Sequence, residues 1–247
     1  MKNLRSVEIE YCNSLEEVFE LGEADEGINE EKELSLLSSL TELKLSRLPE
    51  LKCIWKGPRH VSLQSLVHLN LDSLEKLIFI FTPSLAQSLS KLERLYISDC
   101  RGLKHLIREN YDESEIIPES LGFPKLKILL IGGCGKLEYV FPVSVSPSLL
   151  NLEHMNIVIS NLKQIFYSGE GDAPTRDGII KFPQLRELFL SNCSFFGPKN
   201  FTAQLPSLQE LSINGHEEYF STYLLTQLQV RPLYFSTFSS IFVKTFY

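Results

Sequence analysis

The segment Leu126–Phe141, LKILLIGGCGKLEYVF, decides the fold of this chain. Its opening has the two-residue step of a β-strand at Leu129 and Ile131, so these two side chains point to one face. Apolar residues then recur at every third position, as far as the pair Val140 and Phe141. Steps of three turn the chain back around the far side of the strand. The segment therefore predicts one strand followed by a return path.

This unit is an internal repeat. Eight copies of L-x-x-L-x-L, with Ile, Val or Met at some positions, begin at Leu4, Leu40, Leu66, Leu92, Leu126, Leu152, Leu185 and Leu208. The downstream frame persists in the first six copies, and the sixth is one residue short. A single copy cannot bury its apolar face, whereas stacked copies share one core. We therefore expect an α/β repeat solenoid: a leucine-rich-repeat horseshoe with a parallel β-sheet on the concave face and irregular, 3₁₀ or short helical segments on the convex side.

The repeats predict a leucine-rich-repeat domain over residues 1–215, with acidic or Gly-rich loop insertions near 20–33, 108–119 and 167–178. Residues 216–247 hold nine aromatic residues and no repeat frame, so an irregular C-terminal tail is expected there. That tail is either a cap on the last repeat or non-native sequence from a mispredicted gene end. Because the first repeat begins at residue 4 without an N-terminal cap, the chain is expected to be a fragment or a truncated product.

Charge and hydropathy exclude several classes of protein. The net charge is -7, and nine acidic residues against one Lys lie between Glu16 and Glu33, so the remainder is close to neutral. A nucleic-acid-binding protein usually needs a basic field, which is missing. The sequence has neither the long apolar run of a membrane span nor the apolar core of a signal peptide. Five cysteines in a chain of this length favour free thiols, and a cytoplasmic location is expected.

The residues most suggestive of chemistry have structural interpretations. Cys12, Cys100, Cys134 and Cys193 share one repeat position, where a side chain points inward and satisfies backbone groups at the turn. Equal spacing along a solenoid cannot gather them around one metal ion. Gly132–Lys136 lacks the spacing and the hydroxyl of a phosphate-binding loop. No catalytic, metal-binding or cofactor-binding residue is predicted.

A binding surface is predicted on the concave face. If the frame residues of each strand point inward, positions three, five and seven of each copy point outward. In the third to seventh copies these positions combine apolar and polar side chains, and aromatic residues with Arg often carry interface energy. The predicted partner-binding residues are Arg94, Tyr96, Ile128, Leu130, His154, Asn156, Val158, Glu187 and Phe189. The alternative is that Ile128 and Leu130 pack against an inserted loop.

The unit from Leu126 to Phe141, and the Phe-Pro-x-Leu entry at Phe123 and Phe182, resemble the repeats of plant intracellular disease-resistance proteins of the coiled-coil, nucleotide-binding, leucine-rich-repeat type. The resemblance implies a cytosolic immune receptor that recognises a pathogen effector or a guarded host protein. It also implies repeats that hold a nucleotide-binding domain inactive. Since this sequence has no phosphate-binding loop, any ADP or ATP would belong to a missing domain.

Two other functions fit the sequence less well. A substrate receptor of a ubiquitin ligase also places Cys at the repeat turn, but the helix start that usually follows is absent and no F-box precedes the repeats. An enzyme is disfavoured because the sequence shows no set of residues in a recognisable catalytic arrangement. Recognition of a protein ligand is therefore the leading hypothesis.

Overall fold

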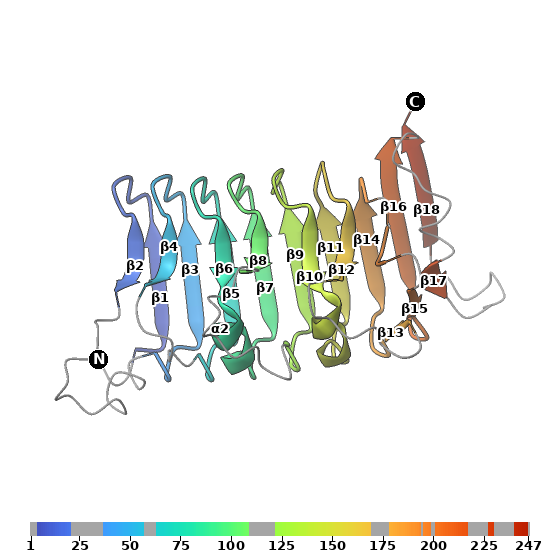
Figure 1. Cartoon of the computed structure of the whole chain (residues 1–247), viewed down its shortest axis with the longest axis horizontal. Helices are drawn as coiled ribbons and strands as arrows, with labels where there is room; N and C mark the ends of the chain where they lie inside the picture. Colours follow the sequence, from blue (N-terminus) through green and yellow to red (C-terminus); the bar gives the residue numbers. More distant parts are fainter. Residues whose placement is uncertain are drawn as a thin grey trace.

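A computed structural model describes residues 4–20, 37–56, 63–108, 122–168, 178–193, 195–198, 201–216, 227–229 and 240–246. The predicted insertions lie almost wholly outside these residues. The main element is a parallel sheet of nine strands that lie side by side in sequence order, with the termini at opposite ends of the array (Figure 1). Its strands are β1 (Ser6–Glu10), β3 (Glu42–Ser46), β5 (His68–Asp72), β7 (Arg94–Ser98), β9 (Ile128–Gly132), β11 (His154–Val158), β14 (Glu187–Ser191), β16 (Glu210–His216) and β18 (Ser240–Phe246).

The repeat frame sets both the register and the core, which confirms the predicted leucine-rich-repeat solenoid. Each frame residue pairs with its equivalent in the next strand, as Leu43 does with Leu69 and Leu69 with Leu95. These three side chains are fully buried. A slip of one residue would turn every frame side chain outward, so burial fixes the register. The predicted outward positions therefore lie on one face of the sheet, which we call the sheet face.

The side opposite the sheet differs in detail from the expectation of irregular or helical segments. It consists mainly of short parallel strands, with one α-helix and one 3₁₀ helix among the described residues. The strands are β2 (Glu17–Glu20), β4 (Cys53–Lys56), β6 (Phe79–Phe81), β8 (His105–Ile107), β10 (Tyr139–Pro142), β12 (Gln164–Tyr167), β13 (Ile179–Lys181), β15 (Thr202–Gln204) and β17 (Leu228–Gln229). Most of the strands from β2 to β12 contain an aliphatic–aromatic pair that aligns with the pair of a neighbouring repeat, as Phe141 does with Phe166. Aromatic and β-branched residues favour extended backbone, so these turns pair as strands.

The two helices follow the short strands of the third and fifth repeats. They are α2 (Pro83–Ser88) and η1 (Val143–Ser148). Thr82 caps α2, because its hydroxyl accepts a hydrogen bond from the Leu85 amide. Ser88 and Ser148 then connect neighbouring repeats by accepting hydrogen bonds from the amides of Leu63 and Phe123. No helix in the described part of the chain is long and apolar enough to cross a membrane.

Phenylalanine side chains form a continuous column through the core between the two sides. Phe123 lies 6.0 Å from Phe81 and 5.5 Å from Phe141 between ring centroids. Phe141 contacts Phe166 at 6.2 Å, and Phe166 contacts Phe182 at 5.7 Å. All five side chains are fully buried. Because each ring packs between rings of other repeats, the column couples the repeats along the solenoid.

A residue with left-handed backbone ends most strands of the sheet. The six residues in this position, with φ between 51° and 66°, are Tyr11, Arg47, Ser73, Asp99, Gly133 and Asn192. The amide of each one donates a hydrogen bond to a carbonyl of the next repeat, as Arg47 does to Asp72. The left-handed turn is therefore part of the contact between repeats. The short sixth repeat lacks this left-handed residue, because Ile159 follows the last strand residue, Val158, directly.

The expectation of an irregular tail after residue 215 is wrong at its end. Ser240–Phe246 forms β18, which pairs with β16 in parallel register. Ile241 and Val243 pair with the frame residues Leu211 and Ile213. The sequence Phe238-x-x-Ile241-x-Val243 is a degenerate form of the repeat that starts with an aromatic residue, and a search for Leu in the first position misses it. A further short strand, β17, pairs with β15.

Truncation of the aromatic column should destabilise the whole solenoid. We expect Phe141→Ala to lower the free energy of unfolding by about 3–5 kcal/mol, because it leaves a cavity in contact with neighbouring repeats. Leu150→Ala is the matched control, since Leu150 is 48% exposed and should change stability by about 0.5 kcal/mol or less. Urea unfolding followed by circular dichroism measures both. Equal losses in the two variants would contradict the column's role.

Candidate recognition surface

The sheet face carries three rows of outward side chains, because every strand offers positions three, five and seven. The middle row places Tyr96 beside Leu130, Leu130 beside Asn156, and Asn156 beside Phe189. Strands in a sheet lie about 4.8 Å apart, so these four residues span roughly 14 Å. The structure therefore brings together residues that are far apart in the sequence.

Apolar side chains gather in the part of the sheet face formed by β7, β9, β11 and β14. We call Tyr96, Ile128, Leu130, Val158 and Phe189 the apolar patch. Leu130 is 37% exposed and Val158 is 49% exposed. The other three are partly buried. Exposed apolar surface on a sheet face favours contact with a partner, because its burial is favourable.

Polar residues border the apolar patch on one side, in the row formed by position three of each repeat. His154 Nδ1 lies 3.0 Å from Glu187 Oε2, and both side chains are partly exposed. Arg94 pairs in register with Ile128 and is exposed. It forms no ion pair within the part of the chain that the structure describes. The predicted site residues thus form one contiguous surface with an apolar centre and a charged margin, the usual composition of a protein interface.

The N-terminal part of the sheet face differs, because Lys44 pairs there with two acidic side chains of β1. Lys44 forms ion pairs with Glu8 and Glu10, and the Nζ–Oε1 distance to Glu10 is 2.8 Å. Hydrogen bonds to these two carboxylates raise the pKa of Lys44. Internal pairing reduces what these groups gain from a new partner. The apolar patch is therefore the better candidate for the contact.

Asp72 is the centre of a second polar network in the N-terminal part of the sheet face. Its carboxylate accepts hydrogen bonds from Ser46 and Ser73, at 3.2 Å and 3.1 Å, and from Ser98. Desolvation by partial burial raises the pKa of Asp72, but the three seryl hydroxyls and the charge of Arg47 outweigh it, so the pKa lies below its usual value. The network connects β3, β5 and β7 across the outward surface. Sequence reasoning missed it, because Ser and Asp at variable positions show no pattern before the strands are aligned.

The structure places the cysteines of the repeat turn as predicted in three copies. Cys100, Cys134 and Cys193 are buried, and each thiol donates a hydrogen bond to a nearby carbonyl, such as Cys134 to Gly132 at 3.3 Å. Burial raises the pKa of Cys193 to about 12, which keeps it a neutral thiol. Cys12 is the exception. It is exposed, because no described repeat packs on the outer side of the first one.

The described residues contain no group of three or more His, Cys, Asp or Glu side chains that could hold a metal ion. All five cysteines are free thiols.

Comparison with known proteins adds the family. Residues 1–101 match the model of plant disease resistance protein RPS2-like leucine-rich repeats. This part of the chain is therefore similar to the leucine-rich repeats of plant disease-resistance proteins. The match confirms the resemblance inferred from the repeat unit, and the register of the later strands continues the same frame past residue 101. No curated protein and no solved structure matched the chain. Repeats of this type typically serve as non-catalytic modules for protein interaction.

The Asp72 network should contribute stability that depends on pH. Because the pKa of folded Asp72 is lowered, its contribution is present above the unfolded-state pKa of about 3.9 and is lost as pH falls through the folded-state pKa. We expect Asp72→Ala to lower the free energy of unfolding by about 1 kcal/mol at pH 7.

The difference between Asp72→Ala and the wild type should shrink as the pH falls from about 4. Urea unfolding at several pH values measures it. Glu75→Ala is the control, since Glu75 is an exposed acidic residue three positions beyond the end of the same strand. If Asp72→Ala lowered the free energy of unfolding by the same amount down to pH 2, the charge of the carboxylate would not contribute to stability.

Proposed function

We propose that this chain is the protein-recognition module of a plant disease-resistance receptor. Its ligand would be a pathogen effector or a guarded host protein, bound through the apolar patch and its charged margin. The observation that carries the proposal is the contrast on the sheet face. Tyr96, Leu130 and Phe189 align in one row without a described element covering them, whereas Lys44 at the N-terminal end of the sheet face pairs with acidic side chains of β1.

The charged margin would give the contact its specificity. Arg94 and the His154–Glu187 pair lie in the row beside the apolar centre, where a partner would meet both signs of charge. Rim charges mainly change association rate and partner choice, and the aromatic centre supplies most of the binding energy. This division favours a folded protein over a small molecule as the ligand.

A second role is proposed for the same module within a receptor. The repeats would contact a nucleotide-binding domain and hold it inactive until the ligand binds. Any ADP or ATP would be held by that domain, and we assign no nucleotide-binding residue to this chain. The proposal rests on the family match over residues 1–101. A cytoplasmic location follows from the same resemblance and is part of this proposal.

Truncation of the apolar patch should abolish capture of the ligand. We expect Tyr96→Ala with Phe189→Ala to weaken binding at least about thirtyfold, because a single aromatic residue at an interface centre can contribute about 2 kcal/mol or more. The measurement is affinity capture from plant cell extract quantified by mass spectrometry. Calorimetric titration of the captured protein, after its purification, then gives the affinity.

The matched control is Glu42→Ala with Asn70→Ala, two outward positions on the polar part of the same face. Its affinity should stay within about threefold of the wild type. Proteins retained equally by both double variants would place recognition elsewhere on the molecule. Capture of a protein with a nucleotide-binding domain would assign the inhibitory contact to this surface, provided that the patch variant loses it and the control keeps it.

A further inference from the structure

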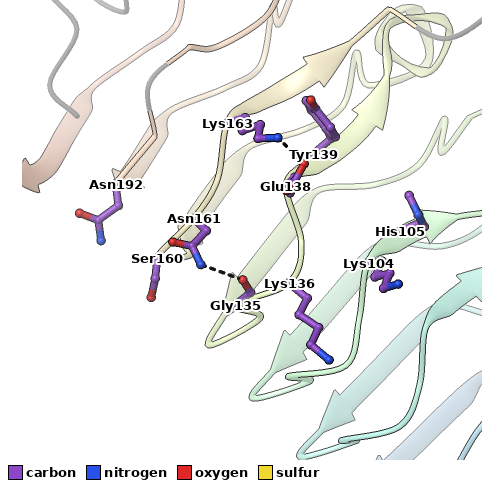
Figure 2. Close-up of a pocket in the computed structure, with 10 residues that line it drawn as sticks. All are labelled: Lys104, His105, Gly135, Lys136, Glu138, Tyr139, Ser160, Asn161, Lys163 and Asn192. Atoms are coloured by element: carbon purple, nitrogen blue, oxygen red, sulfur yellow. Dashed lines mark hydrogen bonds and ion pairs between the residues drawn. The ribbon is translucent and has the colours of Figure 1, made fainter. Parts of the chain in front are cut away.

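A groove of about 810 Å³ lies away from the apolar patch, where the sheet strands of the fourth to seventh repeats turn into the opposite side. Figure 2 shows its side chains, which come from four successive repeats. The lining residues are Lys104, His105, Gly135, Lys136, Glu138, Tyr139, Ser160, Asn161, Lys163 and Asn192. None of them belongs to the predicted recognition surface.

The short sixth repeat explains why the groove lies here. The first five repeats and the seventh have a left-handed residue at the strand end whose amide bonds to the next repeat, but this residue is missing after Val158. Asn161 instead connects back to the preceding turn, because its Nδ2 donates to the Gly135 carbonyl at 3.2 Å. The next turn, at Asn192, bonds onward to Asn214. The groove thus follows the point where the regular ladder of turns is interrupted.

The groove carries positive charge that the protein leaves unpaired. On this side of the solenoid, lysines of other repeats pair with glutamates of their neighbours, as in Lys52–Glu16 at 2.8 Å and Lys76–Glu50 at 2.5 Å. Inside the groove Lys163 pairs in the same way with Glu138 at 2.6 Å. Lys104 and Lys136 are exposed, and their ammonium groups have no ion-pair or hydrogen-bond partner within the described part of the chain. Two ammonium groups are therefore available to an anion.

The neutral side chains of the groove suit a peptide. Ser160 and Asn192 offer a hydroxyl and a carboxamide, which can donate to and accept from peptide groups. Tyr139 contributes a ring that packs against Tyr167 in a tilted arrangement, with a centroid distance of 5.2 Å. The lining has no Arg, whose planar fork is the preferred partner of phosphate.

We propose that this groove is a second binding site that takes an acidic peptide segment of a protein partner. Carboxylates of the segment would bind Lys104 and Lys136, and its backbone would bind Ser160 and Asn192. The site is independent of the apolar patch, so the chain would contact partners through two separate surfaces.

The test measures binding of a fluorescein-labelled decaglutamate peptide to the full chain by fluorescence anisotropy, with a labelled decaglutamine peptide as the reference. We expect binding of decaglutamate, and little of decaglutamine, that weakens from 20 to 150 mM salt. Lys104→Gln with Lys136→Gln should weaken it at least about tenfold, because two charge-assisted contacts are lost. The matched control is Lys91→Gln with Lys125→Gln, which removes two exposed lysines of the same repeats outside the groove and should change affinity less than about twofold.

Asn192→Asp provides an independent variant. Asn192 has φ 55°, a conformation that Asp also tolerates, so the change adds a negative charge to the groove without altering the backbone. It should weaken decaglutamate binding while the melting temperature stays close to that of the wild type. Three results would overturn the proposal: no binding by the wild type, equal losses in the groove and control double variants, or stronger competition by inorganic polyphosphate than by unlabelled decaglutamate.

Discussion

The fold depends on one constraint: no repeat can bury its own leucines. A strand with two inward side chains exposes them unless a neighbour supplies the other half of the core. In the middle of the array the frame leucines, such as Leu69 and Leu95, are fully buried because repeats lie on both sides. In the first repeat Val7 and Ile9 occupy equivalent positions and are only partly buried. The same side-chain types therefore contribute different amounts of stability according to the number of neighbours.

This constraint also separates stability from recognition. Inward positions must be apolar and in register, which leaves the outward positions free to vary. The protein uses that freedom differently along the sheet. The strands from β1 to β5 carry the paired charges of Lys44 and part of the Asp72 network, whereas those from β7 to β14 carry the apolar patch. Along one continuous sheet, the outward side chains thus change from groups that pair with one another to groups that a partner could contact.

Features that depend on a single repeat could be predicted from the sequence, and features that depend on alignment between repeats largely could not. The L-x-x-L-x-L frame fixed the strands, the inward leucines and the set of outward residues, because side-chain direction follows from strand periodicity. The Asp72 network and the groove escaped prediction, since Ser46, Asp72 and Ser98 are 26 residues apart in succession and meet only through strand pairing. The ninth strand escaped because Ile241 and Val243 follow an aromatic residue where the other copies have Leu.

We propose that the apolar patch, and not the polar part of the same sheet, contacts the protein ligand. Hydroxyl-radical footprinting of the chain, alone and in complex with a captured plant protein, tests this contact most directly, because the method reports side-chain exposure residue by residue. We expect Tyr96, Leu130 and Phe189 to lose reactivity in the complex, while Tyr11, which is 61% exposed at the N-terminal end, keeps its reactivity. Unchanged reactivity of these three residues, with protection at Tyr11, would contradict it.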